Sequence, residues 1–164
     1  MDPFLDWIRA TPIGEAMRET PGLFPATEMA HFIGLSLLLG VMTVVDLRVL
    51  GVFRQTSYAS VLKLLPLAVL GFTINLVSGA FFIAANPYLY SSNPAFYVKL
   101  AVILLGGLNA IWFTLAEHRQ IAGLPSDAAA PLPARIMAGA SLGMWVLAIL
   151  LGRLLPTFAY TGGV

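Results

Sequence analysis

Polar and apolar positions divide the chain into long apolar stretches joined by short polar segments. Four stretches contain no Asp, Glu, Lys or Arg, and they cover residues 29–45, 64–98, 100–116 and 136–152. The shorter ones reach the ~20 residues that a helix needs to cross a bilayer core once flanking basic side chains extend to the interface. The pattern predicts transmembrane helices near residues 28–50, 61–85, 95–117 and 134–155.

The second stretch is longer than one span and contains two Asn-Pro dipeptides, at residues 86–87 and 93–94. Asn-Pro favours turns, and the aromatic side chains around these dipeptides are typical of a membrane interface. We therefore expect a short hairpin over residues 86–94, between the second and third spans.

The first 27 residues have a more polar pattern than the spans. Asp2-Pro3 and Thr11-Pro12 each place a capping residue before a proline, which is typical of a helix start. We expect two short amphipathic helices that form an interfacial segment over residues 1–27. The four-helix bundle then covers residues 28–155, and residues 156–164 form a short tail.

Composition changes the picture by excluding whole classes of protein. The 164 residues are 59% hydrophobic and only 10% charged, whereas soluble domains carry roughly 25% charged residues. A net charge of +1 gives no basic patch for nucleic acid, so no nucleic-acid partner is expected. The absence of cysteine excludes disulfides and thiolate ligands. The predicted fold is an all-α integral membrane protein, a four-transmembrane-helix bundle with an N-terminal amphipathic interfacial segment.

The orientation follows from the basic residues near the ends of the spans, which are enriched on the cytoplasmic side. One side of the predicted bundle carries Arg48, Arg54, Lys63, Arg119 and Arg135, and the other carries Arg9, Arg18, Lys99 and Arg153. The first group is larger, so we expect a multi-pass protein of the inner (cytoplasmic) membrane with both termini in the periplasm.

One candidate site lies near the outer boundary of the predicted bundle. Glu28 and His31 lie three residues apart on the first helix, where the carboxylate could orient the imidazole ring. Lys99 and Arg153 fall at the same depth and could neutralise an anion such as a propionate. These four residues form a candidate site for haem b or a metal. The alternative is that His31 is a packing residue that hydrogen-bonds a neighbouring helix.

A second group of polar residues lies deeper in the predicted bundle. Asp46 is one to two turns inside the inner boundary and needs a partner there, for which Arg48, Lys63 and Asn109 are candidates. Asp46, Arg48, Asn75 and Asn109 are therefore expected to be structural or ion-pair residues. The alternative for Asp46 is a proton or cation site.

Several short motifs resemble those of a known family. The patterns H-x-x-G from His31, D-L-R-x-L-G from Asp46 and N-P-x-F-x-x-K from Asn93 to Lys99 resemble a family of small bacterial four-helix membrane proteins of unknown function. The architecture is also distantly similar to copper-resistance membrane proteins and to haem-binding protoporphyrinogen oxidase membrane proteins. The resemblance implies the four-helix fold and singles out His31, Asp46, Arg48 and Lys99, without assigning an activity.

Three functions are consistent with this sequence. The first is a non-catalytic subunit or partner of a larger membrane assembly, the second a haem b or metal-binding redox protein that uses His31, and the third a small oligomeric carrier or channel that uses Asp46, Asn75 and Asn109. The sequence contains no soluble-enzyme motif, and residues 141–145 are interpreted as lipid-level sequence. The expected partners are the lipid bilayer and either further copies of the chain or another membrane subunit.

Overall fold

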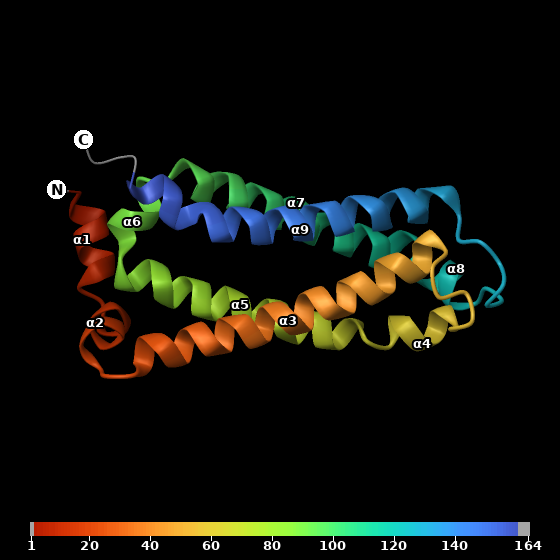
Figure 1. The fold of residues 1–164 in the computed structure, drawn as a ribbon, viewed down its shortest axis with the longest axis horizontal. Coiled ribbons are helices and arrows are strands. Elements are labelled where there is room, and N and C mark those ends of the chain that lie inside the picture. Colours follow the sequence, from red (N-terminus) through yellow and green to blue (C-terminus); the bar gives the residue numbers. More distant parts are fainter. Residues whose placement is uncertain (1, 161–164) are drawn as a thin grey trace.

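The computed structural model describes the backbone of residues 2–160 and the side chains of residues 2–158. It is 82% helix, and the described part contains no strand. The helices, in chain order, are α1 (Pro3–Arg9), α2 (Pro12–Glu19), α3 (Leu23–Leu50), α4 (Tyr58–Leu62), α5 (Leu65–Ala85), α6 (Pro87–Ser91), α7 (Pro94–Ala116), α8 (His118–Ala122) and α9 (Leu132–Tyr160) (Figure 1).

Four segments are long and apolar enough to cross a membrane, as the sequence predicts. They are α3, the consecutive helices α4 and α5, α7, and α9 up to Phe158. They form an elongated bundle with two distinct ends (Figure 1). We call the end that carries α1, α2 and α6 the terminal end. The end that carries α4, α8 and the connections 51–57 and 123–131 is the loop end.

Prolines explain where the observed helices differ from the predicted ones. The first span begins at Leu23 rather than near residue 28, because Pro25 falls in the first turn, where no backbone N–H is needed. The second span is divided at residues 63–64, and Pro66 opens the new helix. The last span extends beyond the predicted end at residue 155, since α9 continues through Pro156 to Tyr160. Residues 161–164 lie outside the described part.

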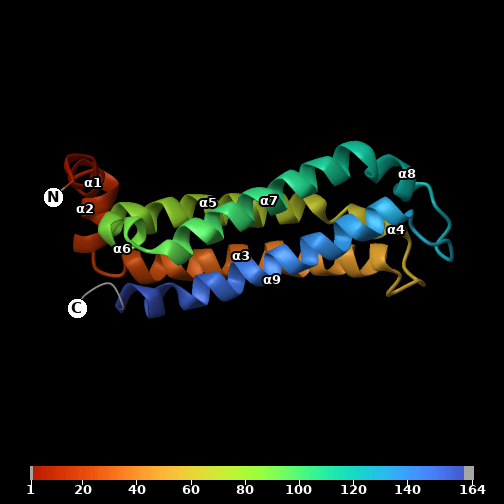
Figure 2. The same cartoon turned by 90° about the horizontal axis from the view of Figure 1, so that it is seen from above.

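The long helices pack as two pairs that meet along one side. α3 packs against α5, α7 packs against α9, and α3 also packs against α9 (Figure 2). α5 and α7 make no comparable contact with each other. The bundle is therefore closed on the α3 and α9 side and less tightly packed between α5 and α7.

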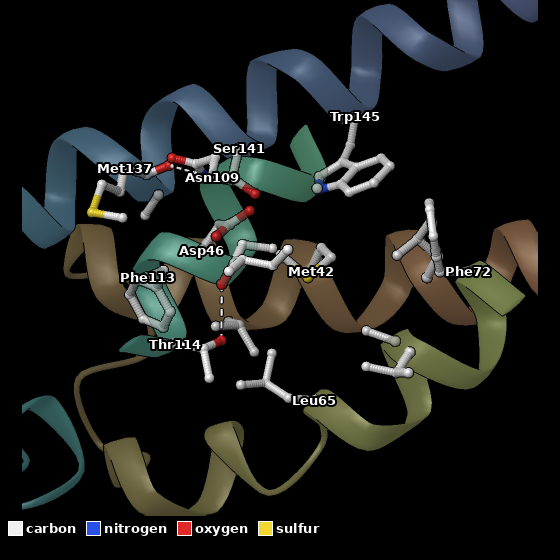
Figure 3. A pocket seen from close by; sticks show the side chains of 18 of the residues that line it. Met42, Asp46, Leu65, Phe72, Asn109, Phe113, Thr114, Met137, Ser141 and Trp145 are labelled. Carbon is white, nitrogen blue, oxygen red and sulfur yellow. Dashed lines mark hydrogen bonds between the residues drawn. The ribbon is translucent and has the colours of Figure 1, made fainter. Parts of the chain in front are cut away.

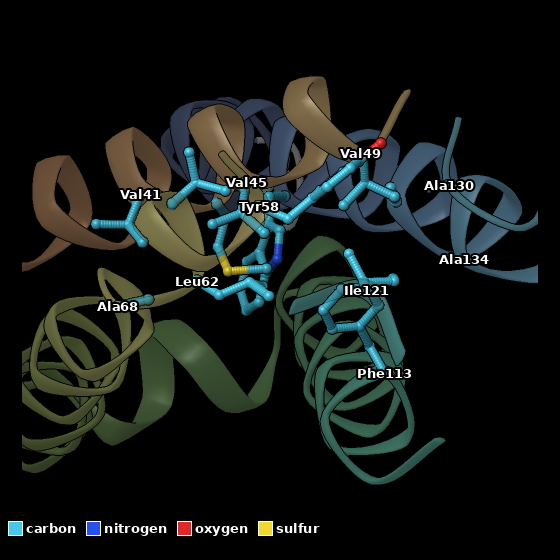
Figure 4. Packing of buried hydrophobic residues seen from close by; sticks show 14 of the residues in the cluster. Val41, Val45, Val49, Tyr58, Leu62, Ala68, Phe113, Ile121, Ala130 and Ala134 are labelled. Carbon is cyan, nitrogen blue, oxygen red and sulfur yellow. The ribbon is translucent and has the colours of Figure 1, made fainter. Parts of the chain in front are cut away.

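The main hydrophobic cluster lies in the loop half of the bundle. Side chains of α3, including Val45 and Val49, pack there against Tyr58 of α4 and Ile121 of α8 (Figure 4). Tyr58 and Ile121 are fully buried. The short helices α4 and α8 therefore complete the core at the loop end.

The N-terminal helices begin at the predicted capping residues. The Asp2 carboxylate accepts from the Phe4 amide at 2.9 Å, and the Thr11 hydroxyl accepts from the Gly14 amide at 3.2 Å. A Cβ on Gly14 would lie 2.6 Å from the Ala84 carbonyl oxygen, so α2 contacts the end of α5 closely. The two helices therefore cover the terminal end of the bundle.

The contact between α3 and α5 depends on two glycines. A Cβ on Gly71 would lie 2.6 Å from the carbonyl oxygen of Gly34, and a Cβ on Gly34 would lie 2.9 Å from that of Gly71. Small residues allow such close approach of helix backbones in membranes, where no hydrophobic effect drives association.

The Gly71→Ala variant is expected to be less stable by about 1–3 kcal/mol, because the added methyl forces the α3 and α5 backbones apart. The measurement is reversible unfolding in mixed micelles. Gly79→Ala is the matched control, since a Cβ at Gly79 on the same helix meets nothing within 4 Å. Equal stability of the two variants would contradict the assigned contact.

A hydrogen bond joins α1 to α6 at the terminal end. The Tyr88 hydroxyl donates to Asp6 Oδ1 at 2.7 Å. This hydrogen bond, helped by the neighbouring negative charge, raises the pKa of Tyr88 above its ordinary value of 10.0. The bond is complete below pH 10.0 and is lost as the pH rises through the raised value.

We expect α1 to loosen from the bundle over that alkaline range, with a change in the fluorescence of Trp7. The experiment compares pH titrations of the natural protein and of Tyr88→Phe, both carrying Trp112→Phe and Trp145→Phe. The variant should lack the transition. A transition that persists in Tyr88→Phe would assign it to another group.

Candidate functional site

A cavity of about 400 Å³ lies between the four spans, in the loop half of the bundle (Figure 3). Its wall is mostly apolar. α3 and α5 contribute Leu38, Met42, Val45, Asp46, Leu65, Ala68, Val69 and Phe72, and α7 contributes Gly107, Asn109, Ala110, Ile111, Phe113, Thr114 and Leu115; α9 contributes Met137, Ala138, Ser141 and Trp145. Such a volume, with apolar walls and few polar groups, is typical of small-molecule sites.

Three buried polar atoms without hydrogen-bond partners belong to residues that line this cavity. They are Asp46 Oδ2, Ser141 Oγ and Trp145 Nε1, and their residues are 4%, 1% and 6% exposed. An unpaired buried polar group costs about 1–3 kcal/mol. Asp46 and Ser141 lie beside each other (Figure 3) and can interact, but neither these two side chains nor the Trp145 indole has a polar partner elsewhere in the described chain. A bound molecule with polar atoms would satisfy them.

Helix periodicity brings these side chains together. Ser141 and Trp145 lie four residues apart on α9 and therefore share one face. Asp46 faces them from α3 (Figure 3). The Trp145 indole lies against Gly106 of α7, where an added Cβ would be 3.4 Å from the ring.

The expected ion pair of Asp46 is not formed among the described residues. Arg48 is fully buried but points to the loop end, where Nε donates to the Thr56 carbonyl at 2.5 Å and a terminal nitrogen donates to the Ser126 carbonyl at 2.7 Å. Residues two positions apart on a helix do not face the same side, which separates Arg48 from Asp46. Lys63 is exposed.

The two predicted asparagines have different positions. Asn109 lines the cavity, and its amide nitrogen donates to the Met137 carbonyl of α9 at 3.1 Å. Asn75 is outside the cavity wall and donates to the Gly71 carbonyl of its own helix at 2.9 Å. Of the two asparagines, only Asn109 therefore lines the same cavity as Asp46.

His31, in the terminal half of the bundle, contacts a neighbouring helix. Its Nδ1 lies 2.7 Å from the Ser78 hydroxyl of α5. That hydroxyl also lies 2.6 Å from the Ile74 carbonyl, which can only accept. We therefore assign the proton to Nδ1, which donates to Ser78 while the hydroxyl donates to Ile74.

The other residues of the candidate site predicted near the outer boundary make contacts different from those of His31. Glu28 is exposed and is not hydrogen-bonded to His31; burial and the Glu28 charge raise the pKa of Tyr90. The Lys99 ammonium extends to α9, where it lies 3.3 Å from a Cβ placed on Gly152, beside the exposed Arg153. His31 therefore contacts α5 and Lys99 contacts α9, with the Lys99 charge near enough to act on His31.

The cavity offers no histidine as a ligand for haem b or a metal. His31 does not line the cavity, and the other histidine, His118, begins α8 at the loop end. The described part of the chain contains no group of three or more His, Asp or Glu side chains that could hold a metal ion.

Sequence analysis missed Ser141 and Trp145. Both lie in a segment interpreted as lipid-level sequence, but both are buried at the cavity. The available signal was their spacing of four residues, which places a hydroxyl and an indole N–H on one face of an otherwise apolar helix.

Comparison with known proteins gives no further guide to the site. The chain matches no family model, no curated protein and no solved structure at a significant level. Its function must be argued from the cavity and its residues.

The buried Arg48 joins α3 to both connections at the loop end. Besides its hydrogen bonds, the guanidinium lies 3.6 Å from the centre of the Tyr58 ring. The Tyr58 hydroxyl in turn donates to the Ala128 carbonyl at 2.9 Å. Residues 51–57 and 123–131 are therefore held by one arginine and one tyrosine.

Replacement Arg48→Met is expected to lower the free energy of unfolding by about 2 kcal/mol or more, because the charge-assisted hydrogen bonds that the buried guanidinium donates to two loop carbonyls are lost. Arg54→Met is the control, since Arg54 is exposed and bonds only the Gly51 carbonyl. The measurement is denaturation in mixed micelles. A loss of similar size in both variants would show that Arg48 has no special role.

Proposed function

We propose that this protein binds a small amphipathic molecule taken from the lipid bilayer, and that the cavity between α3, α5, α7 and α9 is the binding site. The observation that carries the proposal is the group of buried polar side chains Asp46, Ser141 and Trp145 in the wall of an apolar cavity, with no polar partner in the described chain outside the group. Apolar walls with a few convergent polar groups are the usual design of a small-molecule site.

The packing of the spans supports entry from the bilayer. Val69 of α5 and Ile111 and Leu115 of α7 line the cavity and are also 64%, 58% and 82% exposed on the outer surface. These helices make no extensive contact with each other. A molecule dissolved in the acyl chains would reach the cavity between α5 and α7.

The proposal develops the carrier hypothesis rather than the redox hypothesis. Two of the three residues expected for a carrier, Asp46 and Asn109, line the cavity, whereas His31 does not. Side chains of this kind can hold a ligand by charge, hydrogen bonding and apolar contact.

Trp145 provides a reporter of occupancy. Trp7 and Trp112 are 65% and 68% exposed, so Trp7→Phe and Trp112→Phe leave one tryptophan, at the cavity. In lipid nanodiscs, 4-bromoneopentylbenzene is expected to quench Trp145 fluorescence in a saturable way, since bromine quenches on contact. The control is a protein that retains only the exposed Trp112, whose fluorescence measures quenching by probe dissolved in the lipid.

Two glycine variants test the location. A Cβ on either Gly107 or Gly143 meets nothing within 4 Å, but only Gly107 lines the cavity. Gly107→Phe should abolish saturable quenching by filling the cavity, and Gly143→Phe should leave it unchanged. Non-saturable quenching that is the same in both variants would contradict the proposed site.

A further inference from the structure

The charge in the cavity narrows the class of ligand. Among the residues that line it, within the described chain, Asp46 carries the sole ionisable side chain. The nearby basic residues do not neutralise it: Arg48 binds loop carbonyls, and Lys63 and Arg135 are exposed. A carboxylate buried without a countercharge is costly, and a bound cation reduces that cost.

The neighbouring polar atoms also suit a positive group. The Asn109 amide nitrogen is already used by the Met137 carbonyl, which leaves its oxygen as an acceptor at the cavity. The Ser141 hydroxyl lies beside Asp46 (Figure 3); it can donate to that side chain and still accept from a ligand. An anionic headgroup such as a fatty acid carboxylate would find no basic side chain among the residues that line the cavity.

Aromatic rings form part of the apolar wall of the cavity. Phe72 and Trp145 meet edge to face, with ring centres 6.4 Å apart, and Phe113 lies on the opposite part of the wall. Such rings offer a large contact area to the hydrocarbon part of an amphipathic ligand. A bare metal ion would need a nearly complete shell of oxygen ligands, which this mostly apolar wall does not offer.

Resting on the proposed function, we infer that the ligand is a lipophilic organic cation, an amine or quaternary ammonium, whose positive group lies against Asp46 and whose apolar part lies against the aromatic wall.

The test uses two probes of the same shape and the Trp145-only protein in phosphatidylcholine nanodiscs. 4-Bromobenzyltrimethylammonium carries a positive nitrogen where 4-bromoneopentylbenzene carries a neutral carbon. The affinity for each probe is compared between the protein with Asp46 and the Asp46→Asn variant, so that differences in how the probes partition into lipid cancel. Asp127→Asn is the control, since Asp127 is exposed in a loop.

We expect Asp46→Asn to weaken binding of the ammonium probe by about tenfold or more, which is the size of a lost interaction with a charged group. The neutral probe should bind the Asp46→Asn variant with unchanged affinity, which also verifies that the variant is folded. Asp127→Asn should leave the affinity for both probes unchanged.

Other outcomes separate this inference from the proposed function. Saturable binding of both probes that is insensitive to Asp46→Asn would overturn the cationic ligand and leave the cavity as a binding site. The absence of saturable binding by either probe would overturn both. Displacement of the ammonium probe by NaCl, but not by N-methylglucamine chloride, would assign the site to a small inorganic cation and overturn the inference.

Discussion

The engagement of the Arg48 guanidinium at the loop end determines much of this structure. It binds two connections through backbone carbonyls and packs on Tyr58, so it is committed to holding the bundle closed at that end. The same commitment leaves Asp46, two residues earlier on α3, without a positive partner. One short pattern, D-L-R, therefore supplies both the residue that joins the loops and the residue that gives the cavity its charge.

The spans could be predicted because the physical signal is strong and local. A helix that crosses lipid must be apolar over its whole length, so charge-free stretches reveal it. The ends were less certain, because Pro25 and Pro156 are compatible with helices at the positions they occupy. The capped starts at Asp2 and Thr11 were predictable, since capping depends on neighbouring residues alone.

The candidate site was only partly predictable, because sequence gives depth more readily than direction. Asp46 and Asn109 stood out as polar residues in apolar helices, and both line the cavity. Glu28, His31, Lys99 and Arg153 shared a predicted depth, but none of them lines the cavity. Ser141 and Trp145 carry no charge and were missed, although their hydroxyl and N–H are among the unpaired polar atoms.

Gly106 gives the cavity a further property. The indole of Trp145 rests against this glycine of α7, and no side chain lies between them. A larger residue at position 106 would displace the indole, and with it one wall of the cavity. Related chains with the same Asp46 and Ser141 could therefore accept ligands of different length through a change at a residue that is absent from the cavity wall.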